Sequence, residues 1–109
     1  MLGICAIMNN LYHVDSNRES GYGRYDIQMK PFNKNMPGIL IELKVLKNDV
    51  NEEFLEKELE NSAEIALKQI NSRQYVTLMK EEGISKFLKI GIAFYKKHIT
   101  LKSQMDEDD

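Results

Sequence analysis

The stretch 39-ILIELKVL-46 sets two charges inside an otherwise apolar strand. Its odd-numbered residues form one unbroken apolar face, and on the other face Leu40 and Leu46 bracket Glu42 and Lys44. A strand exposed on one side should be polar along that whole side, so the bracketing leucines predict a strand covered on both faces. Burying a charge costs free energy unless it is paired or binds an ion. We therefore expect a functional site here.

The segments before this stretch predict a partner strand and a helix. Residues 24–29 alternate between polar and apolar, which is typical of a half-buried strand, and the proline-containing loop 31–38 fits a hairpin connection. Residues 15–23 are polar and contain two glycines, which indicates turns. Residues 2–12 have helical apolar spacing and predict a short N-terminal helix that begins without a cap.

The segments after it predict two helices and two more strands. Asp49 and Glu52 fit a capping box, followed by an apolar stripe at helical spacing up to Ile70. A second short helix is expected at roughly 73–82, ending at Gly83. Residues 87–95 form a β-rich run in which Gly91 and Ala93 would let a helix pack closely, and 98–102 predict a last edge strand.

This order of elements predicts an α/β protein of mixed α+β character. We expect a four- to five-stranded mixed sheet flanked by helices, because one sheet with helices is the economical way to bury these faces. A right-handed crossover through the helices would make strands 39–46 and 87–95 parallel. We expect one domain over residues 1–105, with a shortened N-terminal helix, and an acidic disordered tail at 106–109.

The composition indicates the cellular compartment but does not indicate what the protein acts on. The formal net charge is −2, and 106–109 hold four of the 17 acidic residues, so charge neither supports nor excludes a nucleic-acid partner. No segment approaches the roughly 18 to 20 apolar residues of a membrane helix, and we expect no membrane partner. Cys5 is the only cysteine, which excludes an internal disulfide and fits the cytoplasm.

Three residues on the two neighbouring strands suit metal chemistry. Glu42 and Lys44 are two apart on a strand, so both side chains leave the same face. If strands 24–29 and 39–46 pair in antiparallel fashion, Asp26 can come level with Glu42. Two carboxylates and the main-chain carbonyl of Leu43 form a hard oxygen site suited to Mg²⁺ or Mn²⁺. Lys44 would orient or deprotonate an attacking water and offset phosphate charge.

The sequence resembles the PD-(D/E)xK nuclease superfamily, in particular the domain at the C-terminus of proteins with an AAA-ATPase-like N-terminal region. The resemblance rests on four ordered segments that cover nearly the whole chain: 16-SNRESGYGRYDI-27, 38-GILIELK-44, 66-ALKQI-70 with Tyr75, and 89-KIGIAF-94. It implies a restriction-endonuclease-like core and a metal-dependent nuclease that acts on DNA more than on RNA.

The resemblance also implies roles for single residues. Asp26 and Glu42 would be metal ligands and Lys44 the catalytic lysine. Glu19 matches an upstream acidic position that holds a second metal ion or its water, and Gln69 matches a helical glutamine that supports the site. Tyr25 stands where many members have proline, and no GxxxxGK[ST] motif occurs in these residues, so we expect the ATPase-like part to be absent. A homodimer or an ATPase-like partner region are the protein partners that this interpretation allows.

Plainer interpretations compete with this one. An arbitrary E-x-K is more often a surface ion pair, but here the bracketing leucines and the Asp26 segment favour a site. Glu19 could equally be solvated in a polar loop. His13 and His98 lack ligand spacing and are interpreted as structural. At the level of function, the alternatives are a nuclease-fold module with a silent site that binds nucleic acid or protein, and a truncated product that folds poorly.

Overall fold

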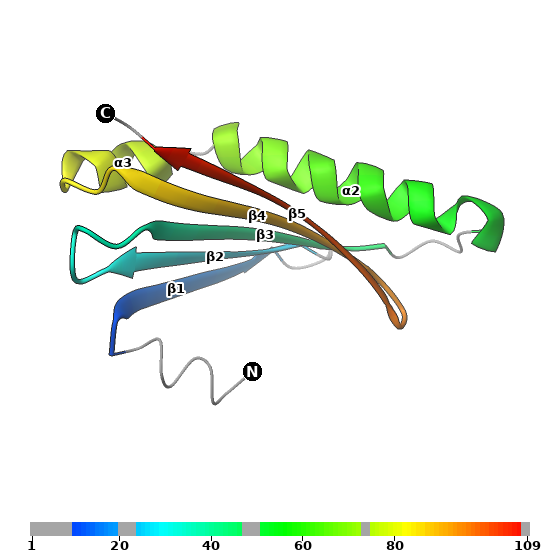
Figure 1. Cartoon of the computed structure of the whole chain (residues 1–109). Helices are drawn as coiled ribbons and strands as arrows, with labels where there is room; N and C mark the ends of the chain where they lie inside the picture. Colours follow the sequence, from blue (N-terminus) through cyan, green and yellow to red (C-terminus); the bar gives the residue numbers. More distant parts are fainter. Residues whose placement is uncertain (1–9, 20–23, 47–50, 73–74, 108–109) are drawn as a thin grey trace.

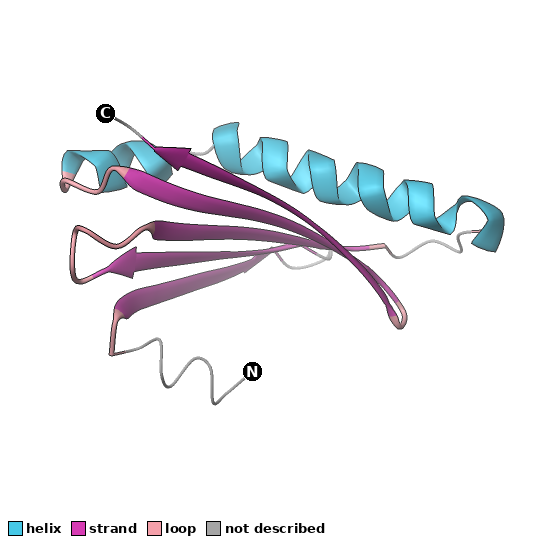
Figure 2. Ribbon diagram, in the orientation of Figure 1, coloured by secondary structure: helices cyan, strands magenta, loops and turns pink. Residues whose placement is uncertain are grey.

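A five-stranded mixed sheet is the centre of the computed structural model, which describes residues 10–19, 24–46, 51–72 and 75–107 (Figures 1 and 2). Both helices lie on one face of this sheet (Figure 1). The elements are β1 (Tyr12–Glu19), β2 (Arg24–Pro31), β3 (Gly38–Val45), α2 (Glu52–Ser72), α3 (Tyr75–Glu81), β4 (Lys86–Tyr95) and β5 (His98–Glu107). The expected α/β class and mixed sheet are confirmed. The expected N-terminal helix falls almost wholly on residues 1–9, outside the described residues.

The strand order is β1-β2-β3-β4-β5, and it explains why the sheet is mixed. Short connections make β1–β2, β2–β3 and β4–β5 antiparallel. The long connection through α2 and α3 returns the chain in the same direction, so β3 and β4 are parallel, as the sequence predicts. The strand that carries Glu42 and Lys44, β3, is thus interior, with β2 on one side and β4 on the other.

Strand β1 corrects the expectation of turns for residues 15–19, and residues 20–23 lie outside the described residues. Its polar residues pair in register with β2 from Tyr12 opposite Pro31 to Glu19 opposite Arg24. An edge strand tolerates such polar composition because only part of its surface must be buried. Tyr12 anchors it: the side chain is buried, and its hydroxyl donates to the Pro37 carbonyl at 2.9 Å. Burial raises the pKa of that phenol.

Helix α2 follows the predicted apolar stripe but not the predicted cap. Asn51 is the N-cap, since its Oδ1 accepts a hydrogen bond from the Glu53 amide at 3.2 Å. The expected capping box relied on Asp49, which lies outside the described residues. The stripe faces the sheet with all its members buried: Leu55, Leu59, Ala63, Ala66 and Ile70. The helix ends at Ser72, two residues after Ile70, the last residue of the predicted apolar stripe.

The second helix closes one end of the core. α3 ends at Glu81, and Gly83, two residues later, adopts a positive φ of 97° as a helix-terminating glycine should. Met79 and Ile84 pack in one buried cluster with Leu40, Ile70 and Phe87. A second buried cluster lies between the first half of α2 and the end of β4, with the members Leu55, Leu59, Ala63, Ala93 and Tyr95. None of the described helices is long and apolar enough to cross a membrane.

Strand β5 corrects the expected end of the ordered chain. It extends from His98 to Glu107, so Asp106 and Glu107 belong to the sheet and not to a disordered tail. The physical reason is Lys89, which is 6% exposed on β4. Its ammonium group donates to Asn71 Oδ1 at 2.6 Å and forms an ion pair with the Asp106 carboxylate. A buried ammonium needs such a partner, and this requirement holds the end of β5 in place.

Candidate functional site

The antiparallel pairing of β2 and β3 places Asp26 directly opposite Glu42. Directly opposed residues on paired strands have their Cβ atoms roughly 4.5 to 5.5 Å apart and their side chains on the same face. The juxtaposition that the sequence predicts for these two carboxylates is therefore present. Their shared face is the one that α2 covers, because Leu40, two residues before Glu42, packs against Ile70 of the helix.

Glu42 is 2% exposed, although it carries a carboxylate. Part of its cover comes from Gly91, its neighbour on β4. A Cβ at Gly91 would lie 2.2 Å from the Ala63 carbonyl oxygen and 2.7 Å from the Leu67 amide nitrogen, so the α2 backbone rests directly on this strand. The close approach that Gly91 and Ala93 predict is confirmed, and it keeps bulk water away from Glu42.

Asp26, at the strand position opposite this buried carboxylate, has an unsatisfied oxygen. Its Oδ1 atom is buried, and no hydrogen-bond donor among the described residues reaches it. An unsatisfied buried acceptor costs roughly 1 to 3 kcal/mol, and more when charged. A divalent cation between Asp26 and Glu42 would satisfy this oxygen and compensate the two negative charges. The donor set thus fits a hard metal ion.

A small cavity lies at the same place. Its volume is about 10 Å³, which is about the space for one water-sized species. It is lined by Asp26, Ile27, Gln28, Leu40, Ile41, Glu42 and Ile70. The space between the carboxylates is therefore on the scale of a single ion, and the surrounding apolar side chains lower the local dielectric, which strengthens electrostatic interactions.

The other residues of the predicted triplet follow from strand geometry. Lys44 is half-buried and lies two residues beyond Glu42, on the same face of β3. Leu43 points to the opposite face, so only its main-chain carbonyl could contribute to a metal site. Glu42 and Lys44 both interact with other groups in the fold, and neither is free.

The two supporting residues are less closely placed. The Glu19 backbone lies opposite Arg24 at the end of β1, two residues beyond the position that faces Asp26. Gln69 is half-buried on α2 and has an interaction partner, but it does not line the small cavity, whereas its neighbour Ile70 does. Among the described side chains, no group of three or more His, Cys, Asp or Glu residues comes together to hold a metal ion.

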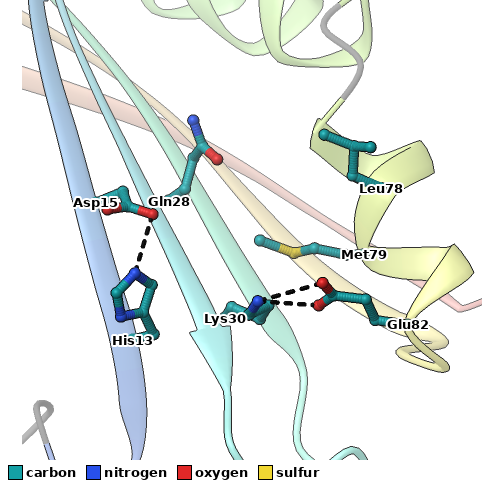
Figure 3. Close-up of a pocket in the computed structure, with 7 residues that line it drawn as sticks. All are labelled: His13, Asp15, Gln28, Lys30, Leu78, Met79 and Glu82. Atoms are coloured by element: carbon teal, nitrogen blue, oxygen red, sulfur yellow. Dashed lines mark hydrogen bonds and ion pairs between the residues drawn. The ribbon is translucent and has the colours of Figure 1, made fainter.

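A larger pocket adjoins the carboxylate pair, between the β1–β2 end of the sheet and α3 (Figure 3). Its volume is about 140 Å³, and it is lined by His13, Asp15, Gln28, Lys30, Leu78, Met79 and Glu82. Two contacts between a basic and an acidic side chain line the pocket: His13 Nε2 lies 3.2 Å from Asp15 Oδ2, and Lys30 Nζ lies 3.1 Å from Glu82 Oε2.

Gln28 is the residue that the sequence analysis missed, since it lines both this pocket and the small cavity. Strand alternation could have found it, because Gln28 lies two residues after Asp26 and must share its face. Alternation alone does not show that a pocket opens there. That depends on where α3 packs on the sheet, which is set by contacts between residues distant in the chain, such as the burial of Met79 with Leu40.

Comparison with known proteins gives one match. A sequence model described as the PD-(D/E)XK nuclease superfamily matches residues 1–104. The match therefore includes both opposed carboxylates, the triplet on β3 and the two strands that flank it. No curated protein and no solved structure matches the chain.

Proposed function

Since this chain belongs to the PD-(D/E)XK nuclease superfamily, we propose that it hydrolyses phosphodiester bonds in nucleic acid, DNA in preference to RNA. Asp26 and Glu42 hold Mg²⁺ or Mn²⁺ in this proposal, and Lys44 assists the attacking water. The observation that carries it is the unsatisfied Oδ1 of Asp26, opposite a carboxylate that is 2% exposed. A cation at this point would satisfy the Asp26 oxygen and lie beside the Glu42 carboxylate.

Each residue of the proposed site has its own role in the hydrolysis. When bound, the divalent ion supplies Lewis-acid stabilisation of the phosphate and lowers the pKa of water. Asp26 and Glu42 fix the position of that charge, because both sit on paired strands and not on loops. The Lys44 ammonium offsets the charge that develops on the scissile phosphate and orients the water. The α2 backbone over Gly91 excludes bulk water, which strengthens each of these interactions.

The remaining predicted residues have supporting roles. The Leu43 carbonyl completes the oxygen ligands, and Glu19, at the end of β1, holds a second ion or its water. Gln69 supports the site from α2, at one remove from the cavity. We further propose that the chain works in the cytoplasm, together with a second copy or with an AAA-ATPase-like region.

Cleavage assays with matched variants test this function. We expect nicking or cutting of DNA that requires Mn²⁺ or Mg²⁺ and falls at least about 100-fold in Asp26→Asn, Glu42→Gln and Lys44→Ala. Glu60→Gln and Lys57→Ala are the controls, because both residues are exposed on α2 and neither lines the cavity of the carboxylate pair. Circular dichroism should show the same fold in all five variants. Undiminished cleavage by a Glu42→Ala/Lys44→Ala double variant would refute the proposal.

The second candidate is a nuclease-fold module that binds nucleic acid or protein without cleaving it. The observation in its favour is that the described residues bring together only two acidic side chains and not three. Titration calorimetry separates the two functions. Mn²⁺ binding to the wild type that disappears in Asp26→Asn supports the nuclease. DNA binding without any Mn²⁺ binding supports the module.

A further inference from the structure

We propose that the pocket between β1, β2 and α3 receives one unpaired nucleobase of the substrate, beside the scissile phosphate, and that Gln28 reads it. This proposal rests on the nuclease function proposed above and adds a preference for adenine at one position next to the cut. The observation behind it is that Gln28 lines both the 140 Å³ pocket and the cavity of the carboxylate pair.

The position of the pocket suits a group attached to the reacting phosphate. Gln28 lies two residues after Asp26 on β2, so the two side chains leave the same face about 7 Å apart along the strand. The pocket continues from the carboxylate pair along this face, toward Lys30 at the end of the strand. A nucleotide whose phosphate sits at Asp26 and Glu42 would thus have its own base, or the neighbouring one, within reach of Gln28.

The charges of the pocket favour a neutral ligand over a second phosphate. Lys30 is paired with Glu82 at 3.1 Å, and His13 faces Asp15 at 3.2 Å, so each basic group already has a carboxylate beside it. A phosphate entering here would meet both carboxylates. The ion pair between Lys30 on β2 and Glu82, directly after α3, also joins the two walls of the pocket.

The walls match the two surfaces of a base. Leu78 and Met79 of α3 form the apolar side, and Leu78 is 56% exposed, which leaves it open to contact with a flat ring. The volume is about 140 Å³, whereas one water needs roughly 10 to 15 Å³ on this measure. The pocket therefore has room for one ring system between the sheet and α3. A base that enters it must leave the stack or come from a single strand.

The Gln28 amide supplies the hydrogen-bonding edge. Figure 3 shows both ion pairs within the pocket and no hydrogen bond from this amide to any of the other residues drawn. A glutamine amide presents one acceptor and two donors, and its side chain can pair with the N6 and N7 atoms of adenine. Substitution by glutamate leaves only acceptors, and a carboxylate accepts from the N4 amine of cytosine.

The experiment is cleavage of a single-stranded library of random sequence, followed by sequencing of the product ends. In the wild type we expect adenine enriched at least about fivefold at one position next to the cut, the lower limit for one bidentate contact. Gln28→Ala should abolish this enrichment, and Gln28→Glu should shift it toward cytosine. Gln104→Ala is the matched control: Gln104 is exposed on β5, at the opposite edge of the sheet, and its loss should leave the wild-type enrichment.

The possible failures are distinguishable. A wild type that binds no Mn²⁺ and does not cut the library refutes the nuclease function, and the base pocket with it. A wild type that cuts without preference near the cut refutes the pocket alone, as does an unchanged preference in Gln28→Glu. Mn²⁺ titration of Gln28→Ala completes the test: affinity within about twofold of wild type supports base reading, and loss of Mn²⁺ binding assigns Gln28 to the metal site instead.

Discussion

Lys89 and Asp106 form an ion pair whose two members have very different surroundings. The Lys89 side chain is 7% exposed, whereas that of Asp106 is 39% exposed and so keeps much of its hydration. Deleting one partner therefore has unequal consequences. Loss of Asp106 leaves the Lys89 ammonium group in the interior, with the hydrogen bond to Asn71 but without its charged partner. Loss of Lys89 leaves a carboxylate that water can reach.

We expect Asp106→Ala to lower the free energy of unfolding by at least about 2 kcal/mol, because the ammonium loses its charged partner. Lys89→Met should cost less, since it removes the buried charge and keeps the apolar stem. Urea unfolding of both variants at pH 7 measures the difference. Equal losses, or a larger loss in Lys89→Met, would show that the pair does not hold β5.

The same carboxylate makes stability depend on pH. The Gln104 amide and the Lys89 ammonium lower the pKa of Asp106 below its ordinary value of 3.8. A group whose pKa is lower in the folded state stabilises fully above its unfolded pKa and loses that contribution as pH falls through the folded value. The stability difference between wild type and Asp106→Asn should therefore be constant from about pH 7 to 5 and shrink below about pH 4. A difference that persists at pH 2 would exclude this origin.

At the scale of elements, the contact between α2 and β4 determines how closely the helix covers the candidate site. Gly91→Ala places a methyl group against the Ala63 and Leu67 backbone at distances of 2.2 and 2.7 Å, so the helix must move. We expect a loss of about 2 to 3 kcal/mol in unfolding free energy, together with weaker Mn²⁺ binding.

Gly38→Ala provides the control for that substitution. Its new methyl group would lie 2.8 Å from Met79 Sδ, the far part of a flexible side chain that can turn away. Thermal unfolding should show a cost below about 1 kcal/mol. If the two variants lose equal stability, the helix does not rest on Gly91 as tightly as the distances indicate.

The start of α2 depends on one hydrogen bond. Asn51→Ala removes the acceptor of the Glu53 amide and should cost about 1 kcal/mol, as N-cap losses do. Asn61→Ala is the comparison, because Asn61 is exposed in the middle of the same helix, where alanine has the higher helix propensity. Thermal unfolding should rank the Asn61 variant at or above the wild type and the Asn51 variant below it.

At the scale of the whole molecule, the sequence predicts what periodicity and spacing determine. Strands β2, β3 and β4, the stripe of α2 and the level pairing of Asp26 with Glu42 all follow from alternation and from short connections. Strand β1 escapes that reasoning because its residues are polar, and its place depends on pairing with β2. The end of β5 escapes it because an acidic run looks solvated until a buried lysine is found beside it.

The parallel pairing of β3 with β4 also determines when the site is complete. Asp26 and Glu42 lie opposite each other on the neighbouring strands β2 and β3. Gly91, on which α2 packs to cover them, belongs to β4, which follows α2 and α3 in the chain. Such distant contacts form late in folding, and synthesis proceeds from the N-terminus. If the proposed nuclease activity needs the covered site, a chain that has not yet folded residues 86–95 onto β3 and α2 would hold both carboxylates without being able to hydrolyse nucleic acid.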